Sequence, residues 1–168
     1  ILLIWPATPD TFWSFRYVLR FISRKAAFPP LGLLTVAAML PRDWNIRLVD
    51  LNAATLRDRD IQWADYVFLS AMIVQAASVR DVIARCKTQH KTIIAGGPLF
   101  TTGHKDFPDV QHVVLGEAEP VMAGLVADLR AGRLQRFYRS EKHPDLTNTP
   151  LPRWDLIRMR NYATMPVQ

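Results

Sequence analysis

Short apolar segments alternate with longer amphipathic segments over the first 116 residues of the chain. Five of the short segments are four to six residues long and rich in β-branched or aromatic side chains, which predicts strands. They cover residues 1–5, 46–51, 66–70, 92–95 and 112–116. Three of these runs are nearly continuous in apolar character, as is typical of parallel strands that are covered on both faces.

The segments between the strands show helical periodicity. A helix is predicted over residues 30–40, where a proline in the first turn is tolerated. Apolar positions at helical spacing predict a second helix over 78–88, with Ser78 as its N-cap. A third helix is predicted over 119–129, and residues 58–62 predict a single helical turn.

Regular alternation of strand and helix predicts a doubly wound α/β domain with an open, mostly parallel, five-stranded sheet. The common order for such a sheet is the flavodoxin-like 2-1-3-4-5, although the sequence alone does not fix it. From residue 133 onward the pattern ends and prolines become frequent, which predicts an extended C-terminal arm. We therefore divide the chain into an α/β domain over 1–132 and a linker over 133–168.

Composition narrows the class of protein. The chain has 168 residues, enough for one domain, and its 49% hydrophobic and 21% charged residues exclude general disorder. The formal charge is +6, but seven of the 21 Lys and Arg against three of the 15 Asp and Glu follow Gly132, so the excess belongs to the arm. This distribution argues against a nucleic-acid interface.

The sequence also lacks the features of secreted and membrane proteins. The one cysteine, Cys86, lies on the apolar face of a predicted helix, which excludes a disulfide framework and fits a reduced, cytoplasmic setting. The longest apolar stretch, residues 31–40, is about half of a bilayer span, so no transmembrane helix is predicted. No signal peptide is recognised, and the start at Ile1 leads us to expect that the chain is part of a longer protein.

A ligand of an open α/β sheet binds outside the carboxyl ends of the strands. A connection of roughly two dozen residues follows the first strand and contains the aromatic side chains of Trp5, Phe12, Trp13, Phe15, Tyr17 and Phe21. This connection forms either the wall of a pocket for a flat apolar ligand or a lid packed on its own domain. Glycines follow the fourth and fifth strands, where they admit backbone or a bulky ligand. The acidic residues after Gly116 either face that ligand or cap the next helix.

Several familiar sites are absent. Neither the dinucleotide-binding nor the P-loop glycine pattern occurs, and Ser70 lacks the glycines of a hydrolase elbow. The four histidines, His90, His104, His112 and His143, show no metal-ligand spacing. The sequence therefore predicts a binding domain, with no catalytic residue and no metal ligand of its own.

The ordered set of motifs resembles the N-terminal cobalamin-binding domain of cobalamin-dependent radical S-adenosylmethionine enzymes. The matching stretches are 28–33, 49–52, 64–65 leading to Ser70, 96–98 with Thr101, 116–119, and the tail over 149–156 with Tyr162 and 165–168. Within that family, the stretches 72–75 and 97–101 and the linker look most similar to hopanoid C-2 methylases. The anaerobic magnesium-protoporphyrin monomethyl ester cyclases, which are oxidative cyclases, are related.

The resemblance implies a cobalamin site at the carboxyl edge of the sheet. By similarity, the residues near the corrin ring or its nucleotide tail are Phe28, Pro29, Leu31, Gly32, Ser70, Met72, Gln75, Gly96, Gly97, Pro98, Thr101, Gly116 and Glu117. The Asp-x-His-x-x-Gly motif of other cobalamin domains is missing, so we expect no histidine ligand to cobalt. S-adenosylmethionine and a [4Fe-4S] cluster are expected in a downstream radical domain, which would be this chain's partner in methyl transfer to an unactivated carbon.

Two other classes of function compete with this interpretation. A flavodoxin-like or receiver-like module would act through protein contacts without a cofactor, but Ser70 stands where a receiver needs its aspartate. A half-domain of a nucleotide-dependent transferase would instead be stabilised by nucleotide and would ignore cobalamin.

Overall fold

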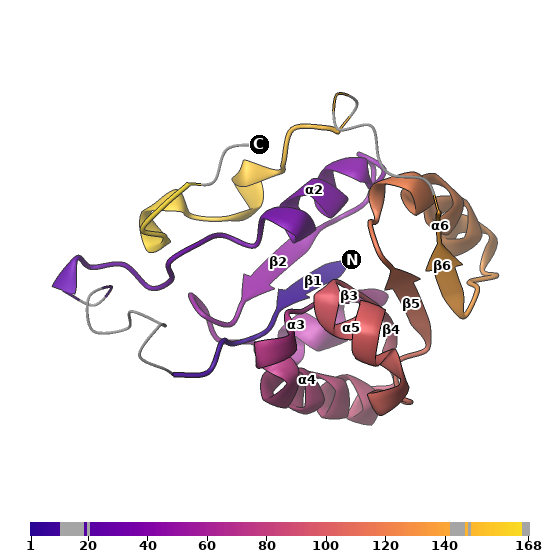
Figure 1. Cartoon of the computed structure of the whole chain (residues 1–168), viewed down its shortest axis with the longest axis horizontal. Coiled ribbons are helices and arrows are strands. Elements are labelled where there is room, and N and C mark those ends of the chain that lie inside the picture. Colours follow the sequence, from indigo (N-terminus) through magenta and orange to yellow (C-terminus); the bar gives the residue numbers. More distant parts are fainter. Residues whose placement is uncertain (11–18, 20, 142–146, 148, 166–168) are drawn as a thin grey trace.

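The computed structural model describes residues 1–10, 19, 21–141, 147 and 149–165. Within these residues the chain forms a six-stranded sheet in the order β2-β1-β3-β4-β5-β6, and every neighbouring pair is parallel (Figure 1). The strands are β1 (Leu2–Trp5), β2 (Arg47–Asp50), β3 (Tyr66–Ser70), β4 (Thr92–Gly96), β5 (His112–Leu115) and β6 (Phe137–Arg139).

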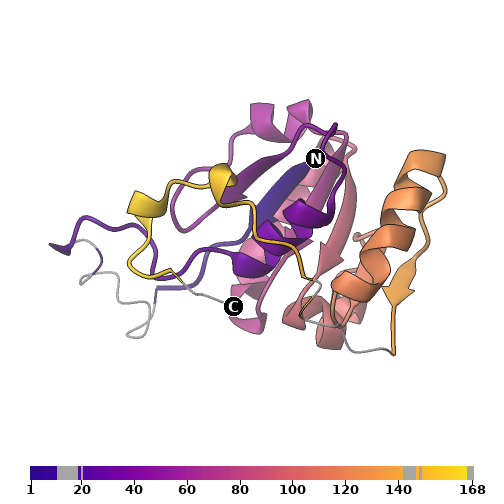
Figure 2. The same cartoon turned by 90° about the horizontal axis from the view of Figure 1, so that it is seen from above.

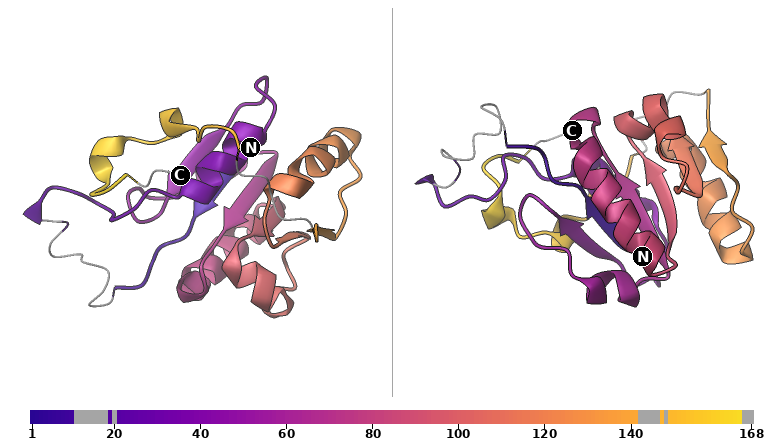
Figure 3. Two further views of the ribbon diagram at one scale, coloured as in Figure 1. Left: turned by 45° about the horizontal axis from the view of Figure 1, so that its top comes forward. Right: turned by 90° about the horizontal axis from the view of Figure 1, so that it is seen from below.

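Helices cover both faces of the sheet, as the doubly wound prediction requires (Figure 3). One face carries α2 (Leu31–Met39) and α6 (Glu119–Ala131), and the other carries α3 (Asp58–Trp63), α4 (Ala76–Thr88) and α5 (Pro98–Gly103). Short 3₁₀ turns are η2 (Ile73–Gln75), η3 (His104–Asp106), η5 (Trp154–Leu156) and η6 (Met159–Asn161).

Successive strand residues divide the core between these two faces because strand side chains alternate in direction. Leu2 and Ile4 of β1 pack beneath the helices of the α4 face, whereas Leu3 packs beneath α2 and α6. Cys86 lies within the same α4-side core and is fully buried. The two apolar layers explain why the strands are apolar along nearly their whole length.

The sheet corrects the predicted number of strands from five to six. The additional strand, β6, has three residues, of which only Tyr138 is buried, so it carries almost no periodic signal. Helix α5 was also missed; it has six residues and follows directly on Gly97. Helix α4 begins at Ala76, so Ser78 is not its N-cap; the Ser78 hydroxyl instead accepts a hydrogen bond from the Ala7 N–H at 2.9 Å.

The C-terminal arm returns along the outside of the domain (Figure 2). After β6, residues 149–165 run beside α2 and include the two turns η5 and η6. The N–H of Arg153 donates to the carbonyl of Leu34 at 3.1 Å, and Tyr162 forms a parallel bridge with Ala26. The assignment of residues 133–168 as a linker stays a prediction.

None of the helices in the described part of the chain is both long and apolar enough to cross a membrane.

Candidate functional site

The carboxyl edge of the sheet contains a switch point between β1 and β3. Strand β1 pairs with β2 on one side and β3 on the other. The connection after β1 leads to α2 on one face, and the connection after β3 leads to α4 on the opposite face. The two connections therefore diverge and leave a crevice between them, which is where an open α/β sheet binds its ligand.

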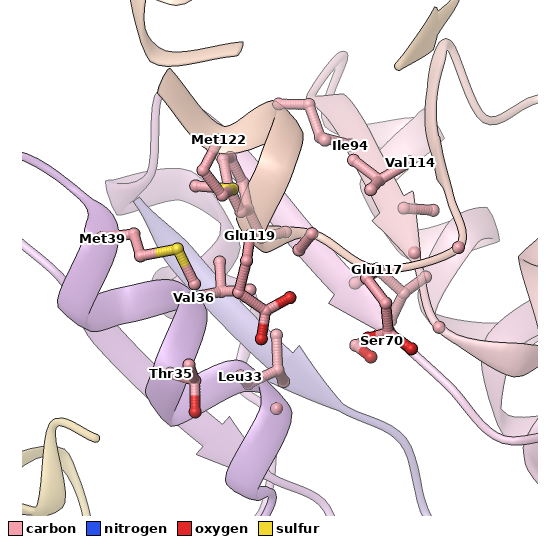
Figure 4. A pocket seen from close by; sticks show the side chains of 18 of the residues that line it. Leu33, Thr35, Val36, Met39, Ser70, Ile94, Val114, Glu117, Glu119 and Met122 are labelled. Carbon is pink, nitrogen blue, oxygen red and sulfur yellow. The ribbon is translucent and has the colours of Figure 1, made fainter. Parts of the chain in front are cut away.

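A pocket of about 360 Å³, here called the interhelical pocket, lies between α2 and α6 (Figure 4). Its floor is formed by the side chains of Phe68, Ile94 and Val114, from three adjacent strands. Apolar side chains of α2, including Val36, and of α6, including Met122, form its walls. The arrangement is a slot suited to a flat, apolar group.

Four of the chain's seven glycines line the interhelical pocket: Gly32, Gly96, Gly97 and Gly116. Gly97 has a φ of 88°, and a Cβ there would lie 2.8 Å from the Ser70 Oγ and 3.0 Å from the Ala71 carbonyl oxygen. Gly116 also has a positive φ, of 78°. Glycine is therefore required at Gly97 by both backbone conformation and close packing.

Besides Thr35, whose hydroxyl donates to the Leu31 carbonyl at 3.1 Å, three polar side chains line this slot: Ser70, Glu117 and Glu119. Within the described part of the chain, none of the three makes a side-chain hydrogen bond or ion pair. In Figure 4 the half-buried Glu119 side chain extends from the start of α6 toward α2. Because a carboxylate only accepts hydrogen bonds, the rim matches a ligand that carries hydroxyl or N–H donors.

Glu119 was absent from the predicted site residues. It could have been found from helical spacing, because it lies one turn before Met122 and so shares the face that packs over the sheet. The alternative prediction, that the acidic residues cap this helix, holds only in its electrostatic form: Glu119 lies in the first turn of α6, but no side-chain hydrogen bond is made at the N-cap.

A second pocket, of about 600 Å³, adjoins the first and is here called the edge pocket. Both pockets are lined by Trp5 and Met72. The edge pocket continues over the carboxyl ends of β1 and β2 to residues 25–29, and its rim includes Phe28, which is 64% exposed. The two pockets together extend along the crevice at the switch point.

The structure brings most of the predicted site residues together. The interhelical pocket is lined by Gly32, Ser70, Met72, Gly96, Gly97, Pro98, Gly116 and Glu117, and the edge pocket by Phe28, Pro29 and Met72. Leu31 begins α2 and lines neither pocket.

Of the aromatic side chains expected in the connection after β1, Trp5 is half-buried and Phe21 is exposed, whereas Phe12, Trp13, Phe15 and Tyr17 lie outside the described residues.

Two of the predicted residues hold loops in place. Gln75 is 1% exposed; its amide nitrogen donates to the Pro6 carbonyl at 2.6 Å and its carbonyl accepts from the Met72 N–H at 2.8 Å. The Thr101 hydroxyl donates to the Gly97 carbonyl at 3.0 Å and accepts from the Gly116 N–H at 3.1 Å. They fix the connections after β1, β3, β4 and β5, and their contact with a ligand stays a prediction.

A buried acidic group lies behind the wall of the edge pocket. Asp50 ends β2 and is 3% exposed. Its carboxylate accepts hydrogen bonds from the Asn52 N–H, the Asn52 side-chain amide and the Tyr162 hydroxyl. Burial nevertheless raises the pKa of Asp50, because the charged form loses water, and the three hydrogen bonds only partly oppose this.

The described histidines lie away from both pockets. His90 precedes β4 and His112 begins β5, so both are at the amino edge of the sheet. His104, in η3, packs its ring edge-on against Phe137. His143 lies outside the described residues. Among the described residues, no group of three or more His, Cys, Asp or Glu is arranged to hold a metal ion.

Residues 17–126 match the family model of the B12 binding domain. This chain belongs to the B12-binding domain family. The matched region runs from the connection after β1 into α6, so it contains both glycine-bearing loops of the interhelical pocket. The family resemblance inferred from the motifs is therefore confirmed.

Curated relatives of this B12-binding domain include methyltransferases. An uncharacterized methyltransferase, sll1242, of Synechocystis sp. is 37% identical over 99% of this chain and 32% of its own length. The hopanoid C-2 methylase of Rhodopseudomonas palustris is 30% identical over the whole chain and 33% of its own length. The bacteriochlorophyllide d C-12(1)-methyltransferase of Chlorobaculum tepidum is 26% identical over 72% of the chain and 27% of its own length.

The chain thus spans about a third of the length of the curated relatives it matches. No solved structure matches it significantly.

Proposed function

We propose that this B12-binding domain holds cobalamin across its two adjoining pockets, with the corrin ring over the edge pocket and the nucleotide tail in the interhelical pocket. The observation that carries the proposal is the pair of pockets meeting at Trp5 and Met72, at the switch point of a chain from this family. A bipartite ligand with a broad ring and a narrower tail matches this pair of spaces.

The edge pocket suits the broad, largely apolar corrin. Phe28 and Met72 stand at its rim with 64% and 50% of their surfaces exposed, and the half-buried Trp5 lies between the two pockets. Apolar side chains of this size are seldom left exposed together unless a partner or ligand covers them. Covering them with the ring would remove apolar surface from water.

The interhelical pocket suits the nucleotide tail. Its floor and walls are apolar, as an aromatic base requires, and glycines at the strand ends let the tail pass close to the backbone. The carboxylates of Glu117 and Glu119 and the Ser70 hydroxyl would accept hydrogen bonds from ribose or amide donors of the tail.

We further propose that the domain serves a radical S-adenosylmethionine methyltransferase. The three relatives, each named as a methyltransferase or methylase, support this class. Cobalamin would supply a cobalt-bound methyl group, while this chain binds and orients it and excludes water from the tail. S-adenosylmethionine and a [4Fe-4S] cluster are proposed for a domain outside these 168 residues, in keeping with relatives about three times as long. The single buried thiol supports a reduced, cytoplasmic setting.

The test is binding of hydroxocobalamin by the purified chain, followed by gel filtration and a visible spectrum of the protein peak. Gly32→Phe should abolish the bound colour, because Gly32 lines the interhelical pocket and the new ring would occupy the ligand's space. The fold itself has room for the change, since a Cβ at Gly32 meets nothing within 4 Å. The matched control is Gly124→Phe, on an exposed position of α6 that lines neither pocket. Both changes replace a helical glycine with a better helix former, so the fold should persist. A colourless wild-type peak, or equal binding by both variants, would overturn the proposal.

A further inference from the structure

The C-terminal arm is attached to the wall of the edge pocket by a set of contacts, here called the arm clasp, between residues 24–27 and 160–164. The N–H groups of Lys25 and Ala26 donate to the carbonyl of Asn161 at 2.8 and 3.1 Å. In return, the N–H groups of Ala163 and Thr164 donate to the carbonyls of Ala26 and Ala27 at 3.0 and 3.1 Å. Two segments more than 130 residues apart in sequence are thus paired like adjacent strands.

Tyr162 is the buried centre of the arm clasp. Its ring is 5% exposed and packs with Ala26, Ala53 and Ile157. Its hydroxyl donates to the Asp50 carboxylate at 3.0 Å. Tyr162 therefore joins the arm both to residues 24–27 and to the end of β2.

Asp50 continues the connection to the other wall of the edge pocket. Its Oδ1 holds the side chain of Asn52, which in turn donates to the Pro6 carbonyl at 3.1 Å and accepts from the Thr8 N–H at 2.8 Å. Thr8 and Asn52 line the edge pocket, as do residues 25–27. Both walls of the pocket are thereby attached to one tyrosine of the arm.

We propose that Tyr162 is a positioning residue of the edge pocket, so that closure of the arm clasp and occupancy of the pocket by cobalamin favour one another. The inference rests on the proposed cobalamin binding. Tyr162, Ala163 and Thr164 do not line the pocket themselves, so the arm acts through the residues it holds. Because coupling between two sites is reciprocal, breaking the clasp weakens binding and binding protects the clasp.

The chain offers a matched control in Tyr138. Tyr138 is also 5% exposed, and its hydroxyl donates to a carboxylate, that of Asp128, at 2.9 Å. It lies on β6, and neither it nor Asp128 lines a described pocket. Tyr138→Phe and Tyr162→Phe therefore each remove a tyrosine–carboxylate hydrogen bond from equally buried residues, one far from the edge pocket and one behind it. Tyr138→Phe also removes the acceptor of the Gln135 N–H at 3.0 Å, so the control disturbs its own surroundings at least as much.

The first measurement is hydroxocobalamin affinity by spectroscopic titration. Tyr162→Phe should weaken binding by about three- to tenfold, and Tyr162→Ala should weaken it further because the ring is also lost. Tyr138→Phe should leave the affinity unchanged within about twofold, with a thermal midpoint lowered at least as much as in Tyr162→Phe. Equal affinities for the two Phe variants would overturn the inference while leaving cobalamin binding itself intact.

The second measurement is amide hydrogen exchange. Saturating hydroxocobalamin should slow exchange at Ala163 and Thr164, although neither lines the pocket. Without cofactor, Tyr162→Phe should speed amide exchange at Thr8 and Ala26 and leave exchange in β3 and β4 unchanged. Tyr138→Phe should leave exchange at Thr8 and Ala26 unchanged. If the wild type binds no cobalamin, the proposed function fails, and the cofactor-free exchange still decides whether Tyr162 holds the pocket walls. Unchanged exchange at Thr8 and Ala26 would overturn that role.

Discussion

The backbone of Gly97 lies so close to Ser70 that a methyl group on Gly97 would approach the Ser70 hydroxyl oxygen to 2.8 Å. The contact joins the ends of β3 and β4, the two strands that pair through Ser70 and Gly96. The contact also fixes the turn into α5, and the absence of a side chain at Gly97 leaves the floor of the interhelical pocket open. Side-chain size at this point is therefore linked to both stability and ligand access.

Gly97→Ala should destabilise the fold by about 1–2 kcal/mol or more, since a φ of 88° strains any side chain and the new methyl group also meets Ala71. Urea unfolding measures the change. Gly124→Ala, an exposed helical glycine with nothing within 4 Å, should instead stabilise by about 0.5–1 kcal/mol. Similar effects at the two positions would show that Gly97 is not under this constraint.

Asp50→Asn should change how stability depends on pH. Burial raises the pKa of Asp50 in the folded state above its ordinary value, so the folded chain holds this proton more tightly than the unfolded chain. The wild type therefore loses stability as pH rises through the folded pKa, and the asparagine variant does not share that loss. The amide can still accept from Asn52 and donate to the Tyr162 oxygen.

The measurement for Asp50→Asn is urea unfolding of both proteins from pH 4 to pH 7. The stability of the variant relative to the wild type should rise as pH increases from the ordinary aspartate pKa through the raised folded pKa, and should then level off. A constant difference, or one that falls, would contradict the burial of a charged carboxylate at this position.

The Cys86 thiol should be inert in the folded chain. It is fully buried in the core beneath α4, and desolvation raises its pKa to about 11. At pH 8 roughly one thiol in a thousand would be ionised, and a thiol-reactive dye has no access to the buried sulfur. A thiol-reactive dye should label the native chain at a small fraction of the rate seen in denaturant. Rapid labelling of the native chain would mean that the core beneath α4 opens.

Histidine replacement should leave the bound cobalamin spectrum unchanged. His90 and His112 lie at the amino edge of the sheet and His104 packs against Phe137, so no described histidine reaches the crevice. We expect His90→Ala, His104→Ala, His112→Ala and His143→Ala each to keep the visible spectrum of the complex. Electron paramagnetic resonance of the reduced complex should show no splitting from a histidine nitrogen. A spectral change in one variant would identify a cobalt ligand.

The sequence predicted the sheet and the glycine-bearing loops because these depend on local patterns. Apolar runs mark the five longer strands, and glycines at the strand ends predicted room for a ligand; Gly96, Gly97 and Gly116 do line a pocket there. Short elements escaped detection, since β6 is three residues long and α5 is six. Glu119 was left out of the predicted site residues, with its role open between ligand and helix cap, because an acidic residue in a first turn has an ordinary explanation in the helix dipole.

Long-range partnerships were the part that could not be predicted. The pairing of Tyr162 with Asp50 joins residues 112 positions apart and leaves no periodic mark in either segment. The hydrogen bonds of the Gln75 side chain to Pro6 and Met72 were equally unforeseen, while its predicted contact with the ligand stays a prediction. Such contacts are set by how the loops cross in three dimensions, which pattern and propensity do not encode.

The short strand β6 has a consequence for how the domain avoids self-association. It pairs along β5 from Val113 to Leu115 and ends the sheet with Arg139, an exposed cation on a strand only three residues long. A chain ending at Gly132 would leave β5 as the outermost strand, with its backbone N–H and carbonyl groups and apolar side chains open to a second molecule. Short, charged terminal strands are a common protection against such edge-to-edge aggregation. We therefore expect β6, with its exposed Arg139, to protect this edge of the sheet from pairing with a second chain.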